Sequence, residues 1–250
     1  MHNYANSELI DSDGKTKVDQ LPEGYDWSDY RAYVGPPDEY DLFSAMVFNL
    51  LTTLGLRQHH RVLDIGCGSL RIGRLLIPYL AKNNYYGIEP NQWLVDNGIQ
   101  NEIGHDLVNI KQPTFSFKDS MEEFKMSLQL DYAVAQSIFS HCGRDLLEGW
   151  LSQVAFHLKD DGALVATFLV NDKDYEGNGW VYPECVLYRP ETMATISAKF
   201  GLDFEILDWE HPRQTWALFS KKEYDKSLIQ NGSVNWNRLI QKVNNQKNNA

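Results

Sequence analysis

The chain has 250 residues, of which 43% are hydrophobic and 23% are charged, and its formal net charge is -11. This length is enough for one sizeable domain, and the composition argues against a disordered chain. The acidic balance argues against nucleic acid or an anionic membrane surface as a partner, because both call for a basic face.

The three cysteines, Cys67, Cys142 and Cys185, are odd in number and far apart in the sequence. They indicate neither a disulfide framework nor a metal cluster, which favours a reducing cytoplasm. No apolar run reaches membrane-spanning length, and the polar N-terminus is not typical of a signal peptide. We therefore expect a cytoplasmic protein without a membrane partner.

Composition divides the chain into three parts. We expect a flexible N-terminal segment over 1–24, one folded domain over 25–222 with an N-terminal lid region over 25–56, and a polar tail over 223–250. A short helix over 234–243 is expected to dock on the domain.

Hydrophobic periodicity predicts helices and strands in alternation along the folded part. The expected helices cover 42–54 with Gly55 as the cap, 70–80, a segment that starts near Pro90, 145–158, and a segment that starts near Pro190. The expected strands cover 61–65, 84–88, 114–118, 131–136, 162–170, 203–209 and 215–220, with a turn at 160–162 and an irregular loop over 171–188.

This succession predicts an α/β fold with a doubly wound, seven-stranded and mostly parallel sheet. The last two strands are joined by a short connection and must be antiparallel, because a parallel crossover needs a dozen or more residues. Ligands of such sheets bind beyond the carboxyl ends of the strands.

A glycine-containing turn follows the first of these strands, in the sequence RVLDIGCGSLRIG. Gly66 and Gly68 allow a tight turn and the close approach of a ligand, although a turn without a ligand is the alternative. A dinucleotide-binding loop would carry a glycine where this chain has Arg71, and Asp64 would repel a pyrophosphate. Both features count against NAD.

This stretch resembles motif I of the class I S-adenosylmethionine-dependent methyltransferases. NYYGIEP (84–90), FSFKDS (115–120) and AQSIFSH (135–141) resemble the family's second-strand acid, its loop acid near the adenine and the segment after its fourth strand. The resemblance implies S-adenosylmethionine as cofactor, held at the turn by Asp64, Gly66, Cys67, Gly68 and Ser69. Leu70 departs from the family's glycine; we expect it to pack under the cofactor or against the sheet, with Ser69 capping the helix.

The resemblance also implies further cofactor-binding residues. Glu89 would accept hydrogen bonds from the ribose hydroxyls, and a solvated loop acid is its alternative. Asp119 with Ser120 would meet the adenine amino group, unless Asp119 caps a turn. The remaining candidates are Pro90, Trp93 or Ile88 at the adenine face, Gln136, Ser137 and Ile138 after the fourth strand, and Tyr30 and Tyr33 over the sulfonium. Trp93 could instead belong to a helix core, and either tyrosine to a surface strap.

His141 is the candidate catalytic base, because it follows the fourth strand at the rim of the predicted crevice. Its alternatives are a helix cap or a pocket wall. The family branch that methylates amides and nucleobases carries an Asn/Asp-Pro-Pro-aromatic segment here, whereas this chain has Gln136-Ser137-Ile138-Phe139. The departure argues against those acceptors and leaves O-methylation of a polar small molecule as the favoured reaction.

Three segments are expected to form the acceptor pocket: the N-terminal aromatic segment, the loop 171–188 and residues 210–216. Candidate substrate-binding residues are Tyr182, Tyr188, Arg189, His211 and Arg213, which suit an anionic or polyhydroxylated molecule. We expect no metal site, since a solvated loop explains the acids at 172, 174 and 176 better.

Two other functions stay open from the sequence. The chain could bind S-adenosylmethionine without transferring its methyl group, or it could be an NAD-dependent enzyme with a Rossmann sheet.

Overall fold

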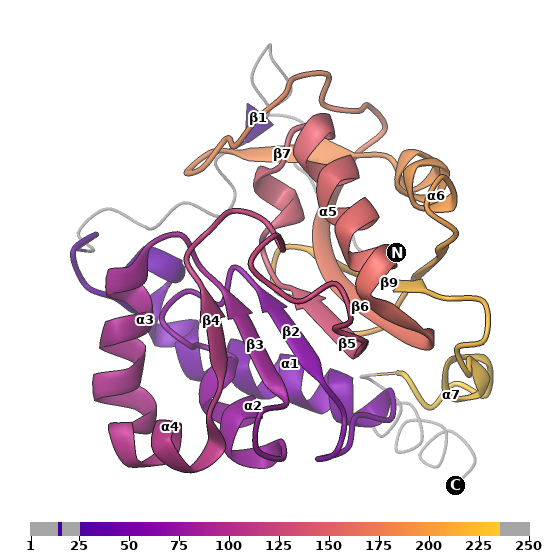
Figure 1. Cartoon of the computed structure of the whole chain (residues 1–250). Helices are drawn as coiled ribbons and strands as arrows, with labels where there is room; N and C mark the ends of the chain where they lie inside the picture. The colour runs from indigo at the N-terminus through magenta and orange to yellow at the C-terminus, as the bar shows by residue number, and fades with distance from the viewer. Residues whose placement is uncertain (1–14, 17–25, 236–250) are drawn as a thin grey trace, which may run out of the picture.

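The computed structural model describes residues 15–16 and 26–235 of the chain. A twisted sheet forms the centre, and helices cover both of its faces (Figure 1). No helix among these residues is both long and apolar enough to cross a membrane.

All seven predicted strands are present. They are β2 (Val62–Ile65), β3 (Tyr85–Ile88), β4 (Thr114–Ser116), β5 (Leu130–Ala135), β6 (Leu158–Val170), β8 (Asp203–Ile206) and β9 (Thr215–Ser220). They run in the order β4-β3-β2-β5-β6-β9-β8, and β9 is antiparallel to both of its neighbours while the other pairs are parallel. The doubly wound sheet with an antiparallel C-terminal pair is confirmed.

The described sheet has nine strands rather than seven. β7 (Cys185–Tyr188) lies in the segment predicted to be an irregular loop and pairs in parallel with the end of β6, and β1 (Lys15–Thr16) pairs antiparallel with β7. The loop prediction fails here because β6 outruns β9: β9 pairs with residues 163–168, so Leu169 and Val170 are available to β7.

The turn predicted at 160–162 is wrong as well. These residues lie inside β6, which begins directly after helix α5 (Arg144–His157). The ladder with β5 changes register between Leu130 and Tyr132, whose partners are Leu158 and Ala163. An irregularity in the strand therefore takes up the polar residues that the sequence places in a turn.

The predicted helices are confirmed with shifted ends. The remaining helices are α1 (Tyr40–Thr53), α2 (Gly73–Tyr79), α3 (Gln92–Gly98), α4 (His105–Lys111), α6 (Pro190–Ala198) and α7 (Ser227–Gln230), with short helical turns at Ala32–Val34, Pro37–Glu39, Ile99–Ile103 and Phe139–His141. Gly55 follows the end of α1 with φ +103°, as a helix-terminating glycine does. α2 starts at Gly73 rather than near Leu70, because Leu70 is left-handed with φ 63°.

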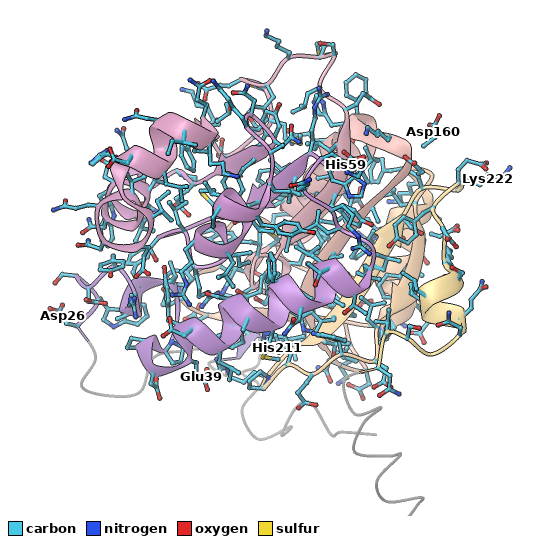
Figure 2. The ribbon with its side chains drawn as sticks, turned by 90° about the horizontal axis from the view of Figure 1, so that it is seen from below. Asp26, Glu39, His59, Asp160, His211 and Lys222 are labelled. Atoms are coloured by element: carbon cyan, nitrogen blue, oxygen red, sulfur yellow. The ribbon has the colours of Figure 1, made fainter. Side chains whose placement is uncertain are left out.

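Two buried clusters lie on opposite faces of the sheet. Leu63 and Ile65 of β2 pack with side chains of α5 and α6, whereas Val62 packs with side chains of α1 and α2. Strand alternation sends successive side chains to opposite faces, so Asp64 points to the same face as Val62. α1 runs along that face, with Glu39 near its first residue and His211 beside it (Figure 2).

The division into three parts stays a prediction. Most of the helix expected over 234–243 lies outside the described residues, and Asn235 forms an isolated bridge with Asp208. Lys15 and Thr16, which the sequence assigns to the N-terminal segment, form β1.

Candidate active site

A cavity of about 660 Å³ opens at the carboxyl ends of β2, β3 and β5. The residues that follow these strands line it, together with residues from 27–43, α5, Trp180, Tyr182 and Arg213. Its volume falls in the ordinary range of ligand pockets, about 300–1,000 Å³. The cavity therefore lies where parallel α/β sheets bind their ligands.

The glycine turn forms one wall of this cavity. Gly66 and Gly68 both line it, with φ +66° and +52°. A Cβ on Gly68 would lie 2.7 Å from Cγ1 of Val34, so a larger residue would displace the neighbouring wall. Leu70 is also left-handed and is fully buried. It thus adopts the conformation that the turn requires although it is not a glycine.

Three residues predicted to hold the cofactor lie behind the turn instead of in the cavity. The Asp64 side chain is 1% exposed and accepts a 2.8 Å hydrogen bond from the Tyr85 hydroxyl. Its burial raises the pKa of Asp64 to about 7. Ser69 is within 3.2 Å of the Tyr40 hydroxyl through Oγ, and Ile72, not Ser69, is the N-cap of α2. Cys67 is buried beside a hollow of about 20 Å³.

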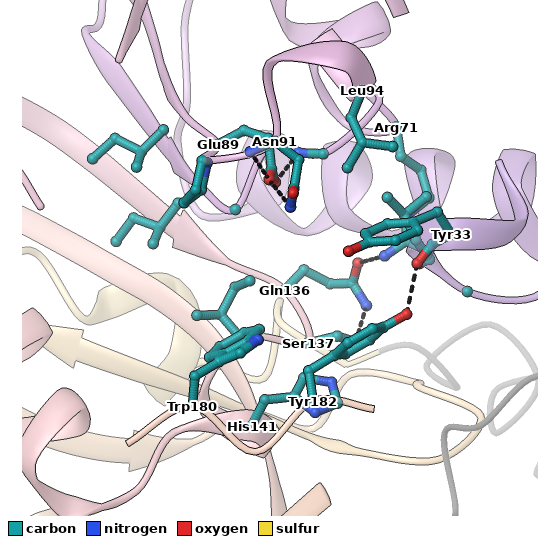
Figure 3. A pocket seen from close by; sticks show the side chains of 18 of the residues that line it. Tyr33, Arg71, Glu89, Asn91, Leu94, Gln136, Ser137, His141, Trp180 and Tyr182 are labelled. Atoms are coloured by element: carbon teal, nitrogen blue, oxygen red, sulfur yellow. Dashed lines mark hydrogen bonds between the residues drawn. The ribbon is translucent and has the colours of Figure 1, made fainter. Parts of the chain in front are cut away.

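Glu89 follows β3 and lines the cavity while only 7% exposed. Its Oε1 accepts from the backbone and side-chain nitrogens of Asn91 at 2.8 and 2.9 Å, and its Oε2 accepts from the Gly68 N–H at 3.2 Å. Burial raises the pKa of Glu89. The carboxylate thus joins the ends of two neighbouring strands, and Figure 3 shows its bonds to Asn91.

The predicted adenine side is brought together in part. Pro90 and Asp119 line the cavity, as do Ile88, Phe117 and Ile138. Leu146 and Trp150 of α5 line it as well, although neither was predicted from the sequence. Trp93 and Ser120 lie outside the lining, and the Trp93 ring packs edge-on against Tyr33.

Arg71, which in the sequence served only as an argument against NAD, lines the cavity. The side chain donates to the Val34 carbonyl at 2.7 Å and to Oε1 of Gln136, and its guanidinium carbon lies 5.0 Å from the centre of the Phe43 ring. The sequence did contain a signal for this role, namely the absence of a third glycine at position 71. The side chain that replaces it must point away from the tight turn.

A buried polar network continues behind Gln136. Gln136 donates to Ser137 Oγ at 2.6 Å, and Gln214 donates to the same oxygen at 3.1 Å and to Ser140 at 3.2 Å. Ser137 is left-handed with φ 59°, and its N–H donates to Thr167 at 2.7 Å. Gln136 and Ser137, both predicted to meet the cofactor, line the cavity in a fixed arrangement.

His141 lines the cavity and is 5% exposed. Its Nδ1 lies 2.7 Å from the carbonyl oxygen of Glu184. A carbonyl oxygen only accepts, so we assign the proton to Nδ1, and the neutral ring then carries its lone pair on Nε2. The contact fixes His141 to the loop before β7 rather than to the helix that follows it.

Aromatic rings surround His141. Tyr182 lies 5.1 Å and Trp180 5.3 Å from its ring centre, and both line the cavity with Trp27 and Tyr33. Figure 3 shows Trp180, His141 and Tyr182 on the side of the cavity opposite Glu89 and Asn91. Tyr30 lies elsewhere, with its hydroxyl 2.9 Å from Glu102.

Two of the five predicted substrate-binding residues, Tyr182 and Arg213, line the cavity. Arg213 donates to Glu39 at 2.6 Å. The other three lie outside the lining. Tyr188 is fully buried with its hydroxyl on the Cys142 carbonyl, and Arg189 pairs with Asp174 at 2.7 Å on the surface.

His211 is 2% exposed and packs on Phe43 and Trp216. Its Nδ1 accepts from the N–H groups of Arg213 and Gln214. Burial, with the charges of Arg213 and Arg71, lowers the pKa of His211 to about 3. The neutral ring therefore holds the loop before β9. Within the described part of the chain, no cluster of three His, Cys, Asp or Glu residues could hold a metal.

A family model described as a methyltransferase domain matches residues 63–164. The match begins in β2 and includes the glycine turn, Glu89 and His141. This region is a methyltransferase domain, which is consistent with the class I S-adenosylmethionine-dependent methyltransferases. Its cofactor is S-adenosylmethionine, and the resemblance seen in the sequence is confirmed.

Solved structures of methyltransferases share the fold. Magnesium protoporphyrin IX methyltransferase from Synechocystis PCC 6803, with bound S-adenosylmethionine, is 15% identical with a TM-score of 0.56, over 76% of this chain and 87% of that chain. An S-adenosylmethionine-dependent methyltransferase from Clostridium acetobutylicum ATCC 824 is 14% identical with a TM-score of 0.53, over 73% and 92%.

The cyclase SpnF is similar as well, with 17% identity and a TM-score of 0.55 over 73% of this chain and 82% of that chain. At such identities the likeness concerns the fold alone, and the fold does not specify the reaction. The acceptor of this methyltransferase must be inferred from its own cavity.

The cavity residues fit the cofactor. The Glu89 carboxylate, buried at the strand end, suits a pair of ribose hydroxyls. The Arg71 guanidinium beside the glycine turn suits the carboxylate of the methionine part.

Proposed function

We propose that this methyltransferase methylates a hydroxyl group of a small molecule, with His141 as the base that takes the hydroxyl proton. The observation that carries the proposal is the orientation of His141, whose Nδ1 faces the Glu184 carbonyl while the ring lines the cavity. This tautomer leaves Nε2 as the basic atom.

Described residues on three sides of the cavity would hold the cofactor. Glu89 binds the ribose, Asp119 with Pro90 meets the adenine, and Arg71 binds the methionine carboxylate. Gly66, Gly68, Gln136 and Ser137 form the wall between them, and Tyr33 lies over the sulfonium. Asp64, Cys67 and Ser69 lie behind the turn, and Trp93 packs against Tyr33 of the cavity lining.

When bound, S-adenosylmethionine supplies a methyl group whose bonding electrons stay on the sulfur as its carbon bonds to the acceptor oxygen. His141 removes the proton that this oxygen loses, so the acceptor leaves as a neutral ether. The Glu184 carbonyl keeps the ring in place during the proton transfer and stabilises the protonated ring. A positioned base of this kind contributes about 10²–10⁴-fold to the rate.

His141→Asn tests the base. The asparagine amide can keep the hydrogen bond to Glu184 but cannot take a proton at the same position. We expect turnover to fall by about 10²–10⁴-fold, measured as transfer of labelled methyl to a panel of hydroxylated compounds, with unchanged affinity for S-adenosylhomocysteine. Turnover of the parent should fall at low pH, because a protonated imidazole cannot accept the proton, and this fall should be absent in His141→Asn.

His157→Asn is the matched control. His157 is also 5% exposed, and its Nδ1 lies 3.0 Å from the Leu128 carbonyl, outside the cavity lining. Parental turnover and an unchanged pH profile in His141→Asn would remove His141 from the mechanism.

A further inference from the structure

Four aromatic residues form what we call the aromatic wall: Trp27, Tyr33, Trp180 and Tyr182. All four line the cavity, and they come from two segments that are far apart in the sequence. The Tyr182 hydroxyl joins these segments by donating to the Tyr33 carbonyl at 2.8 Å. The wall is therefore a built feature of the site rather than a chance grouping of surface rings.

Tyr182 lies at the centre of the wall. Its ring centre is 6.1 Å from that of Trp27, 5.9 Å from that of Tyr33 and 6.3 Å from that of Trp180, whose plane is within 19° of its own. His141 packs against both Trp180 and Tyr182. A molecule held against the wall would thus present its substituents to the proposed base.

The wall leaves much aromatic surface uncovered. Trp180 is 53% exposed and Trp27 is 41% exposed, whereas tryptophan is highly buried on average. Aromatic faces and edges favour another ring in stacked or edge-on contact. A polyhydroxylated ligand would instead need several polar groups at hydrogen-bonding positions.

The charged residues of the cavity lie with other elements. Glu89 bonds to Gly68, and Arg71 bonds to Val34 and Gln136. Lys118 and Asp119 follow β4, and Arg213 contacts Glu39 and the Phe43 ring. The wall itself is built from uncharged rings. This arrangement favours an uncharged ligand over a carboxylate.

We propose that the aromatic wall selects a hydroxylated aromatic compound as the methyl acceptor. This inference rests on the proposed function and narrows its substrate class from small molecules in general to phenol-like ones. The ring of the acceptor packs against Trp180 and Tyr182, and the acceptor's hydroxyl faces His141.

Binding to the full chain saturated with S-adenosylhomocysteine tests ring recognition without turnover. The probes are naphthol, its saturated counterpart decahydronaphthol, naphthoate and benzyltrimethylammonium, titrated by calorimetry and by tryptophan fluorescence. We expect naphthol to bind about tenfold or more tightly than decahydronaphthol and naphthoate, and no less tightly than benzyltrimethylammonium. Equal affinity for naphthol and decahydronaphthol, or a preference for either charged probe, would overturn the inference.

The variant Trp180→Leu tests whether the aromatic wall is what recognises the ring of the ligand. We expect it to abolish the preference for naphthol over decahydronaphthol while the affinity for S-adenosylhomocysteine stays parental. Phe156→Leu is the control, since Phe156 is 55% exposed on α5 and lies outside the cavity lining. A retained preference in Trp180→Leu would contradict the assignment to the wall.

A separate arm measures formation of the naphthyl methyl ether from S-adenosylmethionine. Selective naphthol binding without ether formation counts against the proposed hydroxyl transfer and supports ring recognition. Non-selective binding overturns ring recognition even where another hydroxyl compound is methylated.

Discussion

Arg71 occupies the position in the glycine turn where a dinucleotide-binding loop carries a glycine. A glycine at this position would serve only the backbone geometry of the turn. Arg71 instead brings a positive charge to the cavity wall. Its contacts to Val34 and Gln136 hold the guanidinium there before any ligand arrives. Such preorganisation lowers the cost of binding a carboxylate.

Arg71→Met should therefore weaken binding of S-adenosylhomocysteine by about 10–100-fold, because a charge-assisted hydrogen bond is lost. Binding of methylthioadenosine, which lacks the amino acid part, should change little. Arg74→Met is the control, since Arg74 pairs with Asp41 at 2.7 Å outside the cavity lining. Calorimetry on both ligands decides; an equal loss for the two ligands would contradict the carboxylate contact.

His211 differs from Arg71 because it is buried as a neutral ring rather than as a charged group. Its pKa falls from 6.5 to about 3. The folded state binds the proton more weakly than the unfolded chain does. The contribution of His211 to stability is therefore complete above pH 6.5 and is lost as the pH falls toward 3.

Between pH 6.5 and about 5, this contribution should fall by about 2 kcal/mol. Denaturant unfolding of the parent and of His211→Asn, whose amide can accept the same backbone bonds, measures it as the difference between the two pH dependences. Asp64, whose raised pKa has the opposite sign, cancels in that difference. Parallel pH dependences in the two proteins would show that His211 is not buried neutral.

At the scale of elements, the turn between β2 and α2 forms the floor of the site. Its backbone needs left-handed residues at three alternate positions, and Val34 packs directly over Gly68. A side chain at Gly68 would therefore strain the left-handed backbone and also clash with Val34.

Gly68→Val should lower affinity for S-adenosylhomocysteine by more than about 100-fold while the far-ultraviolet circular dichroism stays parental. Gly104→Val provides the comparison, because Gly104 has φ +79° but nothing within 4 Å of its Cβ position. It incurs similar backbone strain, about 1–3 kcal/mol, and should keep its affinity. Parental affinity in folded Gly68→Val would show that the turn is structural only.

The elements could be predicted to different degrees. Long periodic segments such as α5, and strands with flanking turn signals such as β9, follow from local pattern. β7 could not, because its strand conformation depends on the free end of β6, a distant element. The side of the sheet on which Asp64 lies follows from strand alternation, yet the resemblance alone placed it against the cofactor.

At the scale of the whole molecule, the sheet order brings Gly66, Glu89 and Gln136 from three strand ends to one cavity. These positions were predictable because the carboxyl ends of parallel strands share an edge. The aromatic wall and Arg213 come from segments outside the parallel strands, and their meeting depends on tertiary packing that no local pattern contains. Hence the strand-end residues predicted for the cofactor line the cavity, and their roles stay predictions. The predicted residues that lie outside the lining are Tyr30, Asp64, Cys67, Ser69, Trp93 and Ser120 on the cofactor side, and Tyr188, Arg189 and His211 on the substrate side.

The central claim is that the cofactor occupies this cavity with Glu89 on its ribose. A calorimetric titration of S-adenosylhomocysteine into the parent, Glu89→Ala and the exposed control Glu122→Ala tests it most directly. We predict one site per chain in the parent and in Glu122→Ala, and a loss of about 1–3 kcal/mol, or about 10–100-fold in affinity, in Glu89→Ala. Parental affinity in a folded Glu89→Ala protein would contradict the account.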